Sequence, residues 1–184
     1  MSDGPGATPL PITFLGLAIA TTVYAGFETR ILPPADFHIV GWIVVAMPVP
    51  MQMVAGVWGL VRGELAAATG SAVLAATWLG VALATIAGSP GAPGPTKAEG
   101  LLLFVSAAAM LISMATELVE RELVTAAVML TTTCRFAVTG VSSFTQTQGW
   151  ATAAGVVGFV LAGVALAGAF TVELRSALER RGSS

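Results

Sequence analysis

Six long apolar runs constrain the fold of this chain more than any other feature of its sequence. A membrane-spanning α-helix needs about 20 predominantly apolar residues to cross the ~30 Å hydrocarbon core of a bilayer. Proline, glycine and charged residues separate the runs, which lie at Leu10–Phe27, His38–Val61, Leu65–Ile86, Leu101–Thr116, Leu123–Phe144 and Trp150–Val172. Only 10% of the residues are charged, whereas about 25% are charged in a typical soluble domain. We therefore predict an all-α membrane protein with six transmembrane helices in one bundle.

The distribution of arginine and lysine predicts how this bundle is oriented in the membrane. If the N-terminus is cytoplasmic, Arg30 and Lys97 lie outside the cell. The arginines inside are then Arg62, Arg121, Arg175, Arg180 and Arg181. This bias predicts that both termini of this multi-pass protein of the cell membrane are cytoplasmic. We expect an N-terminal cytoplasmic segment at 1–9, a six-helix transmembrane domain at 10–172, and a charged cytoplasmic tail at 173–184 that continues the last helix into water.

Composition also disfavours several classes of function. The net charge of −2 provides no basic surface for nucleic acid. The single cysteine, Cys134, and the single histidine, His38, exclude an internal disulfide and a metal site built from cysteine or histidine alone. The only lysine, Lys97, lies in a loop, and the common catalytic and nucleotide-binding motifs are missing. We expect no enzymatic activity, no metal and no cofactor, and we interpret the acidic stretch 117–122 as a solvated loop.

Arg135 is the most informative residue, because it lies in the fifth apolar run, about 18 Å from the start of that run at 1.5 Å per residue. A charge at this depth costs at least ~2.5–3.5 kcal/mol on insertion scales, so the side chain should face protein or water. Thr132 and Thr139 lie on the same helical face, and a guanidinium flanked by hydroxyl groups suits a small carboxylate. The alternatives are an ion pair with Glu28 or Asp36, or a side chain that extends outward to the membrane surface.

The second run contains two prolines, Pro48 and Pro50, near its middle. Each proline lacks a backbone N–H, so the helix must bend or break there. Broken helices within a membrane are tolerated where they are buried or line a cavity, and the polar Gln52 follows immediately. We therefore place Pro48, Pro50 and Gln52 on a candidate substrate pathway, together with Arg135, Thr132 and Thr139. The alternative is a packing kink in which Gln52 makes an interhelical hydrogen bond.

Small residues recur every fourth position in the sixth run, at Ala154, Gly158 and Ala162 and at Ala151 and Gly155. Such stripes allow helix backbones to approach closely within a membrane. We predict that they serve helix packing rather than chemistry.

With the six spans placed, the chain resembles the acetate uptake transporter family, the small six-helix bacterial acetate/succinate permeases. The positions that carry the resemblance are Pro9-Leu10, Gly16-Leu17, Thr21-Thr22, Gln52, Ala55-Gly56, Gly63, Trp78, Gly149-Trp150 and Glu173. The chain departs from the family pattern at Pro48-Val49, where the family tends to carry Gly-Gly, and at Leu74, where it carries tyrosine. Arg135 matches no position of the family pattern. The resemblance implies a homohexamer in the bacterial cytoplasmic membrane, with a pathway through each protomer.

These observations predict a channel or proton-coupled permease for a small monocarboxylate such as acetate, with succinate as a further substrate. The expected partners are the carboxylate anion, membrane lipid and further copies of the same chain. One alternative is a passive channel for a small neutral solute such as urea or ammonia, and another is a non-transporting structural subunit of a membrane complex. A cation held in a pore favours an anion over a neutral solute, but only if no carboxylate of the protein neutralises Arg135.

Overall fold

The computed structural model describes residues 8–88 and 96–182, and the segments with regular structure within them are helical. The helices are α1 (Leu10–Glu28), a 3₁₀ turn η1 (Pro34–Asp36), α2 (Phe37–Ala46), α3 (Pro48–Arg62), α4 (Leu65–Ala87), α5 (Lys97–Val119), α6 (Leu123–Thr145) and α7 (Gln148–Gly182). Six helical segments are long and apolar enough to cross a membrane, counting 34–62 as one. The prediction of a six-helix membrane bundle is confirmed. Seven residues of the expected N-terminal segment, 1–7, lie outside the described part of the chain.

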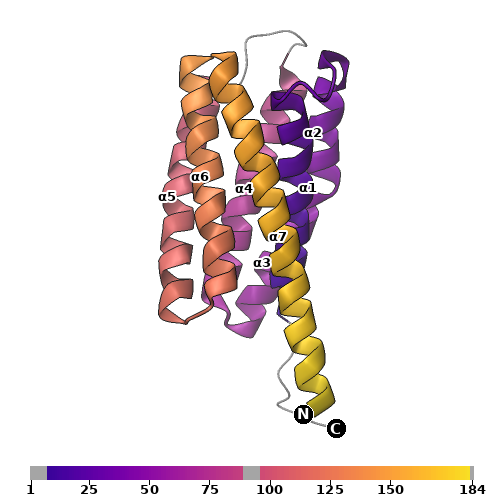
Figure 1. The fold of residues 1–184 in the computed structure, drawn as a ribbon, viewed down its shortest axis with the longest axis vertical. Coiled ribbons are helices and arrows are strands. Elements are labelled where there is room, and N and C mark those ends of the chain that lie inside the picture. The colour runs from indigo at the N-terminus through magenta and orange to yellow at the C-terminus, as the bar shows by residue number, and fades with distance from the viewer. Residues whose placement is uncertain (1–7, 89–95, 183–184) are drawn as a thin grey trace.

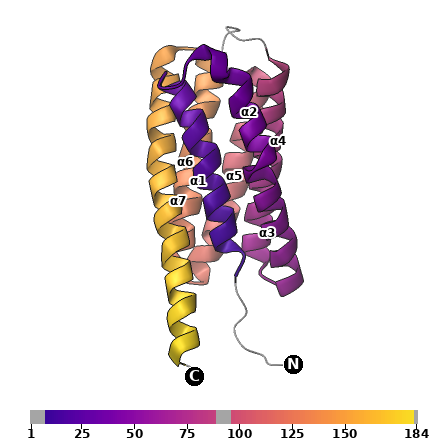
Figure 2. The same cartoon turned by 90° about the vertical axis from the view of Figure 1, so that its right-hand side faces the viewer.

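The six spans pack side by side as a closed ring (Figures 1 and 2). Contacts run from α1 to α3, then to α4, α5, α6 and α7, and from α7 back to α1. The most extensive packing joins α5 to α6 and α1 to α7. Bulky apolar side chains from several spans fill the interior, including Phe14, Leu74, Met110, Phe136 and Leu161. The start of α1 and the end of α7 lie at the lower end of the bundle in Figure 1, and the end of α1 lies at the upper end.

The second span is broken where its two prolines predict. Helix α2 ends at Ala46, Met47 has non-helical dihedral angles (φ −122°, ψ −70°), and α3 begins at Pro48. Both Pro48 and Pro50 therefore fall in the first turn of a new helix, where a missing N–H breaks no hydrogen bond within that helix. The break separates two helical segments of one span, and α3 then ends at Gly63, whose φ of +75° suits glycine.

Two glycines of the predicted small-residue stripe let α7 approach α1 closely. A Cβ added at Gly155 would lie 2.5 Å from Cγ2 of Thr29, and a Cβ added at Gly158 would lie 2.9 Å from Cβ of Ala25. Both distances are well below ordinary van der Waals contact. Because the two helices are this close, the Thr21 hydroxyl can donate a hydrogen bond to the Gly158 carbonyl across 3.2 Å. The packing role predicted for the stripe is confirmed at these positions.

The fourth and last spans extend beyond the apolar runs that predicted them. Helix α5 begins at Lys97 rather than Leu101, because the Thr96 side chain accepts a hydrogen bond from the Glu99 N–H while the Glu99 carboxylate accepts one from the Thr96 N–H. This reciprocal pair is a capping box, which stabilises a helix start whether or not the first turn is apolar. Helix α7 continues without interruption through the charged residues to Gly182, as expected for the tail.

Candidate functional site

Arg135 forms a buried ion pair with Glu28. Its side chain is 2% exposed, and its Nη2 lies 2.7 Å from Oε2 of Glu28, whose side chain is 13% exposed. Its Nη1 donates a hydrogen bond of 2.8 Å to the Thr139 hydroxyl, one helical turn further along α6. Of the two carboxylates that the sequence offers as partners, Glu28 is therefore the one that pairs. Because the pair has no net charge, Arg135 alone no longer favours an anion over a neutral solute.

The ion pair lies where α1, α6 and α7 meet. Glu28 is the last residue of α1, Arg135 is on α6, and the guanidinium packs against α7 at Gly158. A Cβ at Gly158 would lie 3.2 Å from Nε of Arg135, so the absence of a side chain there makes room for the guanidinium. Gln148 at the start of α7 donates from its side chain to the Glu28 carbonyl across 3.1 Å. Three spans thus hold the pair toward the upper end of the bundle.

Thr132 and Thr139 differ in their relation to Arg135. The Thr139 hydroxyl accepts from Arg135 and donates to the Arg135 carbonyl across 2.8 Å. Thr132 is fully buried, and its hydroxyl donates instead to the Val128 carbonyl of its own helix. The structure therefore brings Thr139 to the guanidinium, while the Thr132 hydroxyl bonds within α6 itself.

Gln52 is buried in the bundle interior with an unsatisfied amide. Its side chain is 0% exposed, and neither its Nε2 nor its Oε1 has a hydrogen-bond partner. A Cβ added at Gly16 of α1 would lie 3.3 Å from Cγ of Gln52, so α1 packs directly against this residue. Buried polar side chains are nearly always hydrogen-bonded, to protein or to water, and one without a partner needs an explanation. The interhelical hydrogen bond considered for Gln52 is not made within the described residues.

Near the ion pair, three aromatic side chains pack against one another. The sequence does not predict this contact. The rings of Tyr24 and Trp78 are stacked with centroids 5.6 Å apart, and Phe136 meets Trp78 edge-on at 5.7 Å. The Tyr24 hydroxyl bonds Thr85 across 2.9 Å, whereas the Trp78 Nε1 is buried without a partner. Each residue lies in a separate apolar run, so periodicity alone carries no signal that they meet.

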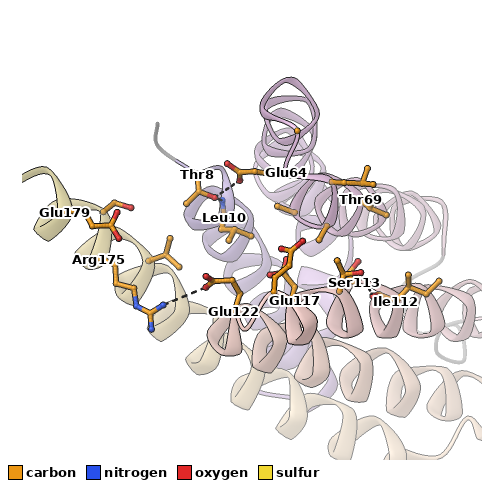
Figure 3. A pocket seen from close by; sticks show the side chains of 18 residues that line it. Thr8, Leu10, Glu64, Thr69, Ile112, Ser113, Glu117, Glu122, Arg175 and Glu179 are labelled. Carbon is orange, nitrogen blue, oxygen red and sulfur yellow. Dashed lines mark hydrogen bonds and ion pairs between the residues drawn. The ribbon is translucent and has the colours of Figure 1, made fainter. Parts of the chain in front are cut away.

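A cavity of about 670 Å³ lies at the lower end of the bundle and is lined by acidic side chains (Figure 3). Five glutamates line it: Glu64, Glu117, Glu120, Glu122 and Glu179. One cation of the lining, Arg175, lies 3.8 Å from Glu122. Glu117 is 4% exposed although it carries a carboxyl group. The interpretation of 117–122 as a solvated loop is therefore wrong for Glu117. It occupies the last turn of α5 and faces the cavity, beside the neighbouring carboxylates (Figure 3).

The acidic cavity has consequences for which ions can approach it. Clustered carboxylates create a negative potential that repels anions and attracts cations and protons. Within the described residues, no group of three His, Cys, Asp or Glu side chains is arranged to hold a metal ion.

Comparisons with known proteins identify the fold. No protein-family model matches the sequence, and a comparison with curated proteins gives no match. Among solved structures, the bacterial acetate channel SatP superimposes with a TM-score of 0.79, over 94% of this chain and 94% of that chain, at 17% sequence identity. At this identity the match establishes a shared fold. This chain is therefore a multi-pass membrane protein with the six-helix fold of the bacterial acetate channel SatP.

Proposed function

We propose that the protein conducts a small monocarboxylate such as acetate across the cytoplasmic membrane, either as a channel or as a permease that couples the carboxylate to a proton. The observation that carries this proposal is the fold shared with an acetate channel over nearly the whole of both chains. Succinate, a dicarboxylate with two such groups, is the further substrate. From the resemblance to the acetate uptake transporter family we also propose that the protein forms a homo-oligomer, namely a hexamer, with a pathway through each protomer.

Buried polar groups support a pathway through the interior. The Gln52 amide has no protein partner; its Nε2 can donate to a carboxylate, and its Oε1 can accept from the water around that carboxylate. Pro48 at the α3 start and the nearby Pro50 hold the helix break beside this amide. Arg135, with Thr139 and Thr132 on the same helix, is the second polar position of the proposed pathway.

The acidic cavity supports proton coupling over free passage of an anion at the lower end. A bare carboxylate approaching Glu117 and its neighbours is repelled, whereas a carboxylate accompanied by a proton is not. By the arginine and lysine bias, we propose that this end faces the cytoplasm.

Isotope uptake into proteoliposomes tests the function. Uptake of labelled acetate is measured at about pH 7.5, where carboxylic acids are almost fully ionised and cross pure lipid least. Empty liposomes give the background. We expect protein-dependent uptake that Gln52→Leu lowers without loss of stability, because leucine fills similar volume and removes two unsatisfied polar atoms. Protein-dependent uptake that Gln52→Leu leaves unchanged would remove Gln52 from the pathway, and the absence of any acetate uptake would refute the function.

A specific observation favours one second candidate, a passive channel for a small neutral solute. Glu28 neutralises Arg135, and the lower cavity is acidic, so neither position attracts a free anion. Protein-dependent flux of urea or ammonia, with no acetate uptake in the same vesicles, would favour this alternative.

A further inference from the structure

The ion pair between Arg135 and Glu28 uses only part of what a guanidinium can offer a carboxylate. Nη2 contacts Oε2 of Glu28 at 2.7 Å, and Nη1 is engaged by Thr139. The neighbouring Nε is buried and has no acceptor. A carboxylate is held most strongly when two parallel N–H groups of the fork bond its two oxygens. Glu28 therefore contacts the guanidinium through one N–H group, whereas a carboxylate that is not attached to the protein could bond two.

The chemistry of Glu28 is that of the proposed substrate. A glutamate side chain ends in a methylene group and a carboxylate, which is acetate joined to the protein through its methyl carbon. A guanidinium in the bilayer interior needs a compensating negative charge, because the uncompensated charge is strongly disfavoured there. A small carboxylate from solution supplies the same charge and the same acceptor atoms as Glu28.

The two partners differ in their freedom to leave the site. Arg135 is 2% exposed and lies in the middle turns of α6, so its backbone and most of its side chain are fixed by packing. Glu28 is the last residue of α1, and its side chain is 13% exposed. Directly beyond it the chain turns, and Arg30 adopts a left-handed conformation with φ of +61°. Glu28 can therefore swing toward water at the upper end while Arg135 stays in place.

We propose that Arg135 and Thr139 form a binding site for a small monocarboxylate, and that Glu28 occupies this site as a tethered counterpart of the substrate. An incoming carboxylate displaces Glu28, and Glu28 returns when the carboxylate leaves. The guanidinium is thereby neutralised in both states, which avoids an unpaired charge within the membrane. This inference rests on the proposed transport of a carboxylate and adds the site at which the protein selects it.

Binding of acetate to purified full-length variants tests the inference separately from transport. Thermal unfolding in detergent is followed against sodium acetate, with sodium chloride keeping the ionic strength constant. Acetamide, a neutral molecule of nearly the same shape, is the control ligand. In Glu28→Gln the tether can no longer neutralise Arg135, so acetate should stabilise this variant and acetamide should not. If Glu28 occupies the site more than about nine-tenths of the time, the variant should bind acetate at least about tenfold more tightly than the unmodified protein.

The matched control is the double variant Glu28→Gln with Arg135→Gln, which removes both charges. It should lose the response to acetate. A double variant that responds as strongly as Glu28→Gln would place acetate binding elsewhere and overturn the inference. Unchanged acetate affinity in Glu28→Gln would overturn it as well.

A second variant covers the case in which Glu28→Gln does not fold. Glu28→Asp keeps the charge but withdraws the carboxylate by one methylene group, so it should compete less and give tighter acetate binding than the unmodified protein. Equal binding would contradict a tethered competitor. If the unmodified protein transports acetate while the Glu28 variants gain no affinity, the inference fails and the proposed function stands. If the variants gain affinity but no acetate is transported, the site stands and the function fails.

Discussion

Replacing Gly158 with alanine tests the contact that holds the ion pair between α1, α6 and α7. The added Cβ would lie 2.9 Å from Cβ of Ala25, 3.2 Å from Nε of Arg135 and 3.2 Å from Oγ1 of Thr21. Because the Ala25 Cβ is fixed to the α1 backbone, the clash is relieved only if a helix moves. Overpacking of this kind costs about 1–3 kcal/mol.

Gly163 on the same helix provides the matched control, because a Cβ added there meets nothing within 4 Å. Both substitutions gain about 0.8–1 kcal/mol from the better helix propensity of alanine. Gly158→Ala should therefore be about 1–3 kcal/mol less stable than Gly163→Ala. The free energy of unfolding is measured for both in mixed detergent micelles, by titration with a denaturing detergent. Equal stability of the two variants would refute the close approach of α1 and α7 at Gly158.

Three further predictions follow from the charges and the helix break. Arg135→Gln alone should lower the free energy of unfolding by about 3 kcal/mol. This is the low end of the range for a broken buried pair, because Glu28 is partly exposed. Adding Glu28→Gln should restore most of this loss in the same titration. A double substitution of Pro48 and Pro50 by alanine should straighten the second span, and should leave membrane insertion and assembly normal while lowering acetate uptake; unchanged uptake would make the break a packing feature. The topology is tested in a Cys134→Ser background, which removes the exposed native cysteine. An impermeant thiol reagent added to intact cells should label Lys97→Cys and should not label Arg121→Cys. The reverse labelling pattern would contradict cytoplasmic termini.

The fold and the helix break could be predicted from the sequence because each depends on local composition. Long apolar runs specify spans whatever their neighbours are, and a proline in the middle of such a run removes a backbone donor and bends or breaks the helix there. The glycines at 155 and 158 likewise carry their signal in their spacing. The apolar run predicts a start of α5 at Leu101, later than the observed start at Lys97, because the capping box that begins the helix is polar and lies outside the run.

The candidate site could be predicted only in part, because its contacts join residues from separate helices. Charge and depth limited the partners of Arg135 to two carboxylates, but the choice of Glu28 depends on how α1 packs against α6. The stack of Tyr24, Trp78 and Phe136 and the burial of Glu117 also depend on helix rotation. Hydrophobic runs that are apolar on every face do not specify that rotation.

The break at Met47 also changes the accounting of hydrogen-bond donors inside the membrane. An ordinary helix start leaves its first four N–H groups without a helical acceptor, and each such group is costly in hydrocarbon. In α3 two of these four positions are Pro48 and Pro50, which have no N–H to satisfy, and a third, Met47, donates its N–H to the Ile43 carbonyl across 3.0 Å. At most the N–H of Val49 is left to be solvated. The same prolines that interrupt the span thus also reduce the number of unsatisfied donors at the interruption, so this chain can begin a helix in the middle of a bilayer at a smaller desolvation cost.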